Sequence, residues 1–480
     1  MNFDPSTLTV HPYAPHHRPE LHFAPEKNWI NDPNGLIFMN GQYHLFFQHN
    51  PFGTDWGHMS WGHAVSRDLL HWKELPVALP EDDEAMIFSG CCVLDFQNTS
   101  GLGTLEHPPL IALYTAHHDQ TGLQTQNLAY SLDEGQNWAK YGVVLDEGIR
   151  DFRDPKVFWH ESTQRWIMAV VLAEHRQVAL YASLDLKSWE KQSTFGPAGH
   201  TGGIWEVPEL LELQDDAGQS HWVVKVDLNP GGPQGGSGCQ YFVGQFDGQT
   251  FTPTQKARWL DYGKDFYAAI TFANLEGRTV WLAWMNNWQY ARTHTTGQYS
   301  GNMSLPRELY LLNTSEGLVL AQTPIRELDG LWEPIEVPSE TQLRAVQHKD
   351  LLALKKAVLD LHVQMNSTDQ SVYGLVLHCA GQLEWALEFD HLNHTLTLTR
   401  QGTVDEEGFQ GQHTAPMVSM GVQDVRLILD HSSLEVFVDG GKLVFTEMFF
   451  PQEGESRLSV YARSGNVSVH VLHARTPPLV

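Results

Sequence analysis

Basic residues are scarce in this chain of 480 residues, which carries 30 Lys and Arg against 57 Asp and Glu, for a formal net charge of −27. A nucleic-acid partner is disfavoured, because binding to phosphates needs a basic face. An anionic membrane surface is disfavoured for the same reason. The acidity is spread along the chain rather than gathered in a tail, a pattern that favours solubility through self-repulsion.

Long hydrophobic runs are also missing. No stretch of about 18 apolar residues occurs, which excludes a membrane-spanning helix. Residues 1–23 contain Pro, His and Asp but no apolar core of a secretion signal, so we expect a cytoplasmic protein, with a secreted form left open. Only four cysteines are present, and Cys91 and Cys92 are adjacent. That spacing fits neither a disulfide framework nor a Cys-x-x-Cys metal site, and reduced thiols suit the cytoplasm.

Aromatic residues, in contrast, are plentiful, with 16 Trp, 14 Tyr and 22 Phe. They are enough to fill large buried cores, and the composition excludes a disordered chain. The length allows two or three domains at the usual domain size.

A short phrase of Ser, Asp and Trp recurs in the first two thirds of the chain. It occurs as Ser66-x-Asp68-x-x-x-Trp72, as Ser131-x-Asp133 with Trp138, as Ser183-x-Asp185-x-x-x-Trp189, and as a weaker echo over residues 246–251. The copies lie between short strand-like runs, and no long amphipathic helix is visible. Short strands with turn signals at this repeat length are typical of propeller blades with about four strands each.

The pattern changes after residue 325. Residues 324–338 have the composition of a linker, and beyond them Leu434–Val438, the turn Asp439–Gly441 and Leu443–Phe445 predict a hairpin. The segment 351–363 is compatible with a helix or a strand. The sequence therefore predicts an all-β chain: a five-bladed β-propeller over 1–325, a linker over 326–340 and a β-sandwich over 341–480.

Four short segments place a carboxylate beside turn-forming or aromatic residues at the start of a predicted strand. They contain Asp32, Asp154, Glu206 and Asp265, and they are spaced by one or two blade lengths. The missing member for the second blade falls at Phe88-Ser89-Gly90. Because equivalent positions on successive blades face one central channel, we expect the five segments to converge there.

Converging carboxylates with aromatic walls suit the cleavage of a glycosidic bond. One carboxylate acts as nucleophile or base, and one carboxylic acid donates a proton to the leaving oxygen. Aromatic faces pack on the C–H surfaces of sugars, while amides and carboxylates bind the hydroxyl groups. Like charges held close together raise a pKa and keep one acid protonated near neutral pH.

The same segments resemble the motifs of glycoside hydrolase family 32, the β-fructofuranosidases, and the resemblance covers nearly the whole chain. Residues 29–35 are similar to the family's nucleophile motif, 153–155 to its second acidic motif and 205–208 to its acid/base motif. The resemblance implies a retaining exo-β-fructosidase that releases terminal β-fructofuranosyl units from sucrose, fructo-oligosaccharides, inulin or levan. In such an enzyme Asp32 would be the nucleophile, Glu206 the acid/base and Asp154 the transition-state stabiliser.

The resemblance also implies a set of residues that line the fructose pocket: Asn31, Gln48, Trp56, Phe88, Ser89, Arg153, Tyr267 and Trp288, with Trp61 as a further candidate. It implies no metal and no organic cofactor, and no His-Glu-x-x-His or Cys/His ligand set is visible. The expected partner is a small-molecule or oligosaccharide substrate. A homo-oligomer through the sandwich is left open.

Two departures from the family's pattern bear on the pH optimum and on which leaving group the enzyme prefers. Val207 stands where most members have Cys, and residues 293–301 depart from the usual Pro-Trp-Arg loop beside the pocket. Residues 229–244 and 259–268 resemble the exo-acting levanases and exo-inulinases. Two alternatives remain open: a fructosyltransferase on the same scaffold, and a non-catalytic carbohydrate-binding propeller.

Overall fold

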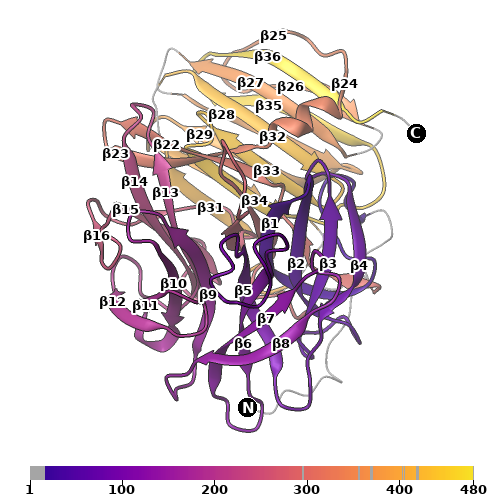
Figure 1. Cartoon of the computed structure of the whole chain (residues 1–480). Coiled ribbons are helices and arrows are strands. Elements are labelled where there is room, and N and C mark those ends of the chain that lie inside the picture. Colours follow the sequence, from indigo (N-terminus) through magenta and orange to yellow (C-terminus); the bar gives the residue numbers. More distant parts are fainter. Residues whose placement is uncertain are drawn as a thin grey trace.

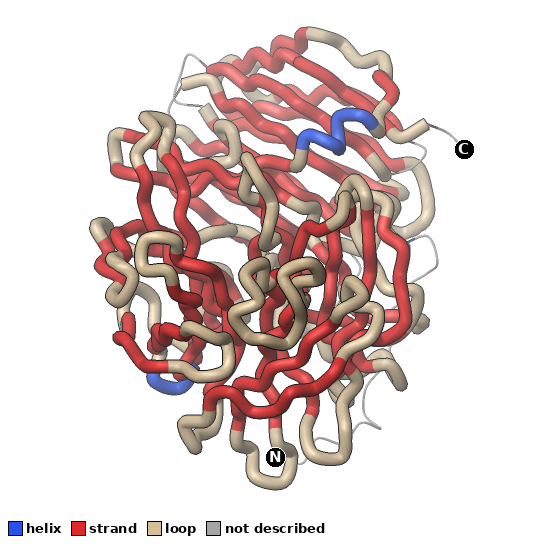
Figure 2. The backbone as a smooth tube through the Cα atoms, in the orientation of Figure 1, coloured by secondary structure: helices blue, strands red, loops and turns tan. Residues whose placement is uncertain are grey.

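The computed structural model describes residues 17–293, 297–354, 357–367, 371–402, 404, 406–417 and 421–478. Within these ranges the chain forms β-strands and two short 3-10 helices, η3 (Ala173–His175) and η4 (Arg326–Gly330). A propeller precedes a two-sheet sandwich, and Figure 2 shows how completely strands dominate both parts. The predicted all-β architecture is confirmed. No helix within these ranges has the length and apolar character to cross a membrane.

Five sheets form the blades of the propeller (Figure 1). The first blade has β1 (Asn28–Met39), β2 (Gln42–Asn50), β3 (Ser60–Ser66) and β4 (Trp72–Leu79). The second has β5 (Met86–Leu94), β6 (Leu110–His117), β7 (Gln124–Ser131) and β8 (Ala139–Leu145). The third has β9 (Phe152–His160), β10 (Arg165–Leu172), β11 (Gln177–Ser183) and β12 (Glu190–Phe195). The fourth blade has β13 (Ile204–Gln214), β14 (Ser220–Asn229), β15 (Gly238–Phe246), β16 (Phe251–Pro253) and β17 (Arg258–Trp259). The fifth has β18 (Tyr267–Thr271), β19 (Val280–Met285), β21 (Asn302–Met303), β22 (Arg307–Thr314) and β23 (Gly317–Pro324).

The first strand of each blade faces the central channel. These inner strands contact one another in the ring order β1, β5, β9, β13 and β18, and β18 returns to β1. The short strand β20 (Tyr299–Ser300), which belongs to the connection between β19 and β22, pairs in parallel with the start of β1. The last blade is thereby joined to the first, and the ring is closed without a covalent link.

The recurring Ser-Asp-Trp phrase is the turn between the third and fourth strands of the first three blades. In the first copy the Ser66 hydroxyl donates to Asp68, whose carboxylate accepts the His71 N–H, and the Trp72 indole N–H donates to the Leu69 carbonyl. The second and third copies repeat the Ser-to-Asp bond and the indole bond. The phrase therefore recurs at the spacing of the blades, because each copy forms the hydrogen bonds of its own turn.

Hydrophobic cores fill the spaces between neighbouring blades. One core, for example, combines Ile167 and Val171 of β10 with Trp205 of β13 and Trp222 of β14, which belong to successive blades. Burial of such side chains stabilises the fold by roughly 25 cal/mol per Å² of apolar surface. All four cysteines are free and buried, and Cys91 and Cys92 point into two different cores.

Two sheets make up the sandwich, coloured orange to yellow in Figure 1. One contains β24 (Glu333–Pro334), β25 (Glu340–Leu343), β27 (Leu359–Ser367), β32 (Gln423–Asp430), β33 (Ser433–Val438), β34 (Leu443–Met448) and β36 (Val467–Thr476). The other contains β26 (Gln347–Leu354), β28 (Val372–Cys379), β29 (Gln382–Asp390), β30 (Thr395–Arg400), β31 (Gly411–Pro416) and β35 (Ser456–Ser464).

The structure decides the one segment of this half whose type the sequence pattern left open, and it confirms the predicted hairpin. The segment 351–363 contributes to two strands, β26 and β27, which lie in different sheets. The predicted hairpin forms between β33 and β34. Within residues 326–340 lie η4 and the strand β24, and β24 pairs with β36.

Buried ion pairs join the propeller to the sandwich. Arg307 of β22 pairs with Glu435 of β33 at 2.8 Å, and Arg400 of β30 pairs with Asp265 beside β18. His22 lies between two sandwich carboxylates, 2.8 Å from Asp430 and 3.1 Å from Glu435. Burial alone lowers the pKa of His22, but its bonds to these carboxylates raise it to about 9.

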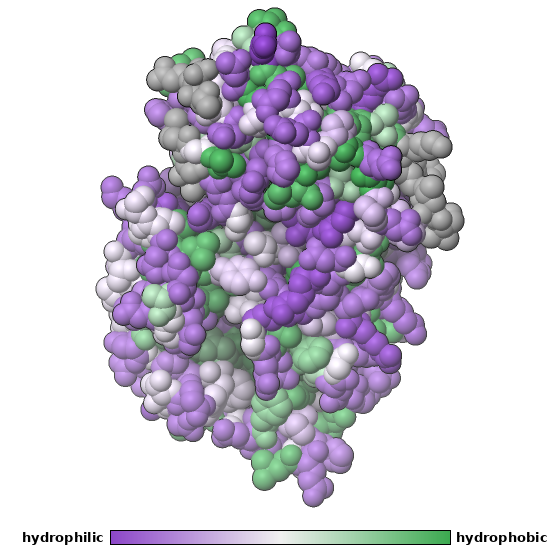
Figure 3. All heavy atoms as spheres, turned by 90° about the horizontal axis from the view of Figure 1, so that it is seen from above, coloured by the Kyte–Doolittle hydropathy of each residue, from purple (hydrophilic) through white to green (hydrophobic). Residues whose placement is uncertain are grey.

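The face drawn in Figure 3 is mostly hydrophilic, with scattered hydrophobic patches.

Candidate active site

All five inner strands carry a register irregularity at the segment predicted to face the channel. The shifts follow Ile30 in β1, Ile87 in β5, Glu206 in β13 and Tyr267 in β18, and in β9 the shift spans Asp154. A β-bulge turns a side chain out of the regular alternation and recurs next to active sites. Bulges at five equivalent positions therefore direct functional groups towards one mouth of the channel.

Asp32 is buried and has a hydrogen-bond donor on each carboxylate oxygen. The Ser89 hydroxyl of the next blade donates to Oδ2 at 2.6 Å, and the Asn31 amide donates to Oδ1 at 3.0 Å. The Trp29 indole N–H holds the Asn31 oxygen at 2.8 Å, which fixes the direction of the amide. Burial raises the pKa of Asp32, while the two donors lower it and stabilise the anion.

Asp154 has a positive φ of 64° and is buried in the third blade. Its Oδ2 accepts the Val207 N–H at 2.9 Å, and its own N–H donates to the Thr115 hydroxyl at 2.9 Å. Burial raises the pKa of Asp154 to about 7; Arg153 opposes that rise, and the charges of Glu206 and Asp32 add to it. The three predicted catalytic carboxylates thus lie close enough to influence one another.

Glu206 is held at both carboxylate oxygens. Arg153 donates to Oε1 from Nη2 at 3.1 Å, and the Tyr267 hydroxyl donates to Oε2 at 2.5 Å. Arg153 also forms an ion pair with Asp151. Side-chain accessibility differs between the acids, with 16% for Glu206 and 7% for Asp154, so Glu206 is the more open to an incoming molecule.

A buried ion pair that the sequence analysis did not identify supports this site from the second strand of the fourth blade. Lys225 and Asp227 are 2.7 Å apart and inaccessible, and the register places Asp227 opposite Glu206. Lys225 also donates to the Val207 carbonyl, and the Ala268 N–H donates to Asp227. Two charges within the apolar run 222–228 are the sequence signal that would have revealed the pair.

Of the predicted pocket residues, Gln48 is buried and donates to the Ile87 carbonyl, which supports the strand that carries Ser89. Trp56 and Phe88 meet edge to face at 6.0 Å. Trp288 stacks on Trp29 with ring centroids 6.1 Å apart. These contacts add aromatic walls to the carboxylates.

Arg292 is a further functional candidate that the sequence analysis missed. Its guanidinium lies over the rings of both Trp56 and Trp288, at 4.8 and 5.9 Å from their centroids. It introduces a cation at the aromatic wall of a site otherwise dominated by acids. Nothing in the local sequence marked Arg292, because the contact depends on two rings more than 200 residues apart.

Two expectations about side-chain direction are wrong. Asp265 does not face the channel: it is fully buried, pairs with Arg400, accepts the Tyr290 hydroxyl and accepts the Met448 N–H at 2.8 Å. Trp61 is fully buried as well, and its indole N–H donates to the Phe88 carbonyl, so it lies behind the pocket wall. On the fifth blade Tyr267 occupies the position facing Glu206 instead of Asp265.

The two departures from the family's pattern lie at different places. Val207 packs in a hydrophobic core and has a φ of 42°, an unfavourable value for a β-branched residue. Of the divergent stretch 293–301, residues 294–296 lie outside the described residues. Across the described ranges, no group of three or more His, Cys, Asp and Glu side chains could hold a metal ion.

Chemically, the arrangement offers one carboxylate with a fixed donor on each oxygen, Asp32, and one more accessible carboxyl group, Glu206. The third acid is Asp154, whose pKa is raised to about 7 by burial, to which the charges of Glu206 and Asp32 add. A nucleophile, a proton donor and an electrostatic stabiliser are the groups that displacement at an anomeric carbon requires.

Comparison with known proteins identifies one family in both domains. Residues 22–324 match the glycosyl hydrolases family 32 N-terminal domain, and residues 329–476 match the family 32 C-terminal domain. A levanase from Bacillus subtilis is 40% identical over 96% of this chain and 70% of its own length. An extracellular exo-inulinase from Aspergillus awamori is 36% identical over 92% of this chain and 90% of its own length.

Solved structures show the same likeness. The crystal structure of exo-inulinase from Aspergillus awamori superposes with a TM-score of 0.89 at 34% identity, covering 97% of this chain and 99% of that one. A fructofuranosidase from Schwanniomyces occidentalis, solved in complex with fructosylnystose, superposes with a TM-score of 0.84 at 30% identity, covering 96% of this chain and 99% of that one.

Proposed function

The chain belongs to glycosyl hydrolase family 32 and is a glycoside hydrolase of the β-fructosidase type, and from this we propose that it is a retaining exo-acting enzyme. Its substrates are terminal, non-reducing β-D-fructofuranosyl units of sucrose, fructo-oligosaccharides and β-fructans. The relatives support this range, because they include a levanase, an exo-inulinase and an invertase. Family membership sets aside the non-catalytic sugar-binding alternative.

The observation that carries the proposal is the convergence of Asp32, Asp154 and Glu206 from three different blades. Asp154 accepts the N–H of Val207, the neighbour of Glu206, and Arg153, the neighbour of Asp154, donates to Glu206. The charges of Asp32 and Glu206 both raise the pKa of Asp154. Such clustering of like charges costs stability, and active sites are where proteins retain it.

In this reaction Asp32 attacks C2 of the fructosyl unit, and the bond to the leaving oxygen breaks. Ser89 and Asn31 hold the two carboxylate oxygens in place, and their hydrogen bonds favour the ionised form and so lower the pKa that burial raises. Glu206 transfers its proton to the leaving oxygen. In the second step it takes a proton from water, the water oxygen bonds to C2, and the bond from C2 to Asp32 breaks, which releases fructose. Tyr267 and Arg153 orient the Glu206 carboxyl group throughout.

Asp154 binds ring hydroxyl groups of the fructosyl unit without forming a covalent bond. Its Oδ2 accepts the Val207 N–H. Oδ1 is left to accept hydroxyl protons. A hydrogen bond to a charged acceptor strengthens as positive charge develops on the sugar ring, so this contact favours the transition state over the ground state.

The test is to measure free fructose from sucrose, 1-kestose, inulin and levan in parallel, with the native chain and with Asp32→Asn. The native chain is expected to release free fructose, together with glucose from sucrose or a chain shortened by one fructosyl unit from the longer substrates, and Asp32→Asn to lose activity by about 10³-fold, the scale on which a catalytic group acts. Asp83→Asn, which changes an exposed carboxylate, is the matched control.

Fructose release that survives in Asp32→Asn would overturn the mechanism. Accumulation of kestose at high sucrose concentration would show transfer to sugar instead of water, and would favour the fructosyltransferase alternative.

A further inference from the structure

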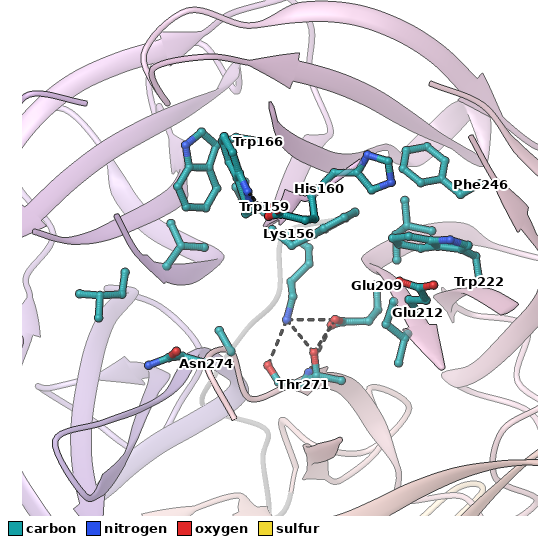
Figure 4. Close-up of a pocket in the computed structure, with 18 of the residues that line it drawn as sticks. Lys156, Trp159, His160, Trp166, Glu209, Glu212, Trp222, Phe246, Thr271 and Asn274 are labelled. Carbon is teal, nitrogen blue, oxygen red and sulfur yellow. Dashed lines mark hydrogen bonds and ion pairs between the residues drawn. The ribbon is translucent and has the colours of Figure 1, made fainter. Parts of the chain in front are cut away.

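A second cavity, of about 630 Å³, lies at the opposite mouth of the channel from the catalytic carboxylates. It is lined by the carboxyl-terminal parts of the inner strands β5, β9 and β13 and by the residues that follow β18 (Figure 4). On the same strands the catalytic segments lie nearer the amino-terminal ends. The volume is within the usual range of ligand pockets, about 300–1,000 Å³.

A closed polar cluster forms the inner end of this cavity. The Lys156 ammonium donates to the carbonyl and hydroxyl of Thr271, at 3.0 and 2.9 Å, and pairs with Glu209 at 3.0 Å. Figure 4 shows Lys156 reaching across the channel to both residues. Because its three donors are occupied, Lys156 is not free to bind an anion.

Aromatic rings form two platforms on the cavity wall. Trp159 and Trp166 pack edge to face with centroids 5.2 Å apart. Trp222 packs against Phe246 at 5.0 Å and against His160 at 5.6 Å. The rings contact one another edge to face or tilted, without parallel stacking.

Polar groups beside the platforms have hydrogen-bonding capacity to spare. The strand register places Glu212 directly opposite Trp222, so their side chains lie on one face of the sheet. Among the described residues, neither the Trp222 indole N–H nor the Glu212 carboxylate nor His160 Nε2 has a hydrogen-bond partner. A donor and an acceptor side by side next to an aromatic face match adjacent hydroxyl groups of a sugar.

The charges at the mouth narrow the class of ligand. Glu161, Glu212 and Asp247 line the opening and are exposed, and the cavity's one lysine is neutralised by Glu209. An anionic ligand is therefore repelled. Apolar ring faces, spare donors and acceptors, and the absence of a free cation in the lining suit a neutral polyhydroxylated ligand.

We propose that this cavity is a second carbohydrate-binding site, which takes a neutral mono- to trisaccharide away from the catalytic carboxylates. The ligand's C–H faces lie on the Trp159 and Trp222 platforms, and its hydroxyls bond to Glu212 and to the Trp222 N–H. The proposal goes beyond the proposed function and does not rest on it, because it concerns equilibrium binding and no bond cleavage.

The test is isothermal titration calorimetry of the full chain with D-fructose, D-glucose and maltose, none of which contains a fructosyl linkage to cleave. Trp159→Ala removes a half-buried platform, and Glu212→Gln removes an exposed charge and acceptor. The control Glu453→Gln changes an exposed carboxylate of the sandwich. Circular dichroism checks that each variant is folded.

We expect saturable binding of at least one of these sugars, weakened tenfold or more in Trp159→Ala and threefold or more in Glu212→Gln, and unchanged in Glu453→Gln. Trp288→Ala, which removes an aromatic wall of the catalytic site and does not line this cavity, should leave this binding in place. Binding that neither variant weakens, or the absence of saturable binding, would overturn the proposal. So would binding of choline in place of sugar, which would identify a cation site.

Discussion

Replacing Ser89 by Ala removes the hydroxyl that donates to Asp32 Oδ2 at 2.6 Å. The change leaves Asp32 buried with only the Asn31 amide as a side-chain donor. A hydrogen bond to a charged group is worth about 1.5–3 kcal/mol. Since one pKa unit corresponds to about 1.4 kcal/mol, loss of the bond should raise the pKa of Asp32 by about 1–2 units.

Sucrose hydrolysis measured as kcat/KM against pH tests this shift, because the acidic limb of that profile reports ionisation in the free enzyme. Asp32 must be ionised to attack, so the acidic limb of Ser89→Ala should move up by about 1–2 pH units. Ser304→Ala, which removes a buried hydroxyl bonded only to backbone groups, is the matched control and should not move the limb. A loss of kcat/KM that is equal at all pH values would refute the role assigned to Ser89.

Three further predictions follow from the same contacts. Tyr267→Phe removes the hydroxyl that donates to Glu206, and sucrose kcat/KM should fall by about 10–100-fold, whereas an unchanged value would show that the bond is not used in catalysis. Arg400→Met leaves Asp265 uncompensated at the domain interface, so the free energy of unfolding in urea should fall by about 3–5 kcal/mol; a fall below 1 kcal/mol, roughly, would contradict this. His22, with its pKa raised to about 9, contributes stability that is fully present below about pH 6.5 and is lost as pH rises through 9. His22→Gln should therefore lower the free energy of unfolding by about 3 kcal/mol at pH 6 and by little above pH 9, as measured by urea titration at both pH values.

The blade period was readable from the sequence because its signal is local. Each Ser-Asp-Trp turn closes its own hydrogen bonds, so the residues recur wherever the turn does. The same period located Ser89 on the second blade, and the structure brings it to Asp32. The domain bounds, the cytoplasmic location and the oligomeric state stay predictions.

Side-chain direction was not readable, because it depends on bulges and on neighbours from other sheets. Asp265 has the right spacing for the channel, but Arg400 of the sandwich and Tyr290 draw its carboxylate to the domain interface. Lys225 and Asp227 support the site from a second strand, where register decides which residue faces Glu206. Spacing along a chain gives the blade and the position in it, whereas packing between sheets decides what the side chain contacts.

The stereochemistry of the first product tests the central claim most directly. In water containing methanol, the enzyme passes the fructosyl group of sucrose to methanol as well as to water. NMR identifies the anomer of the methyl fructofuranoside, which, unlike free fructose, does not mutarotate. A covalent bond to Asp32 followed by attack with the help of Glu206 inverts C2 twice, so methyl β-D-fructofuranoside is the predicted product. Methyl α-D-fructofuranoside as the first product would contradict Asp32 as the nucleophile.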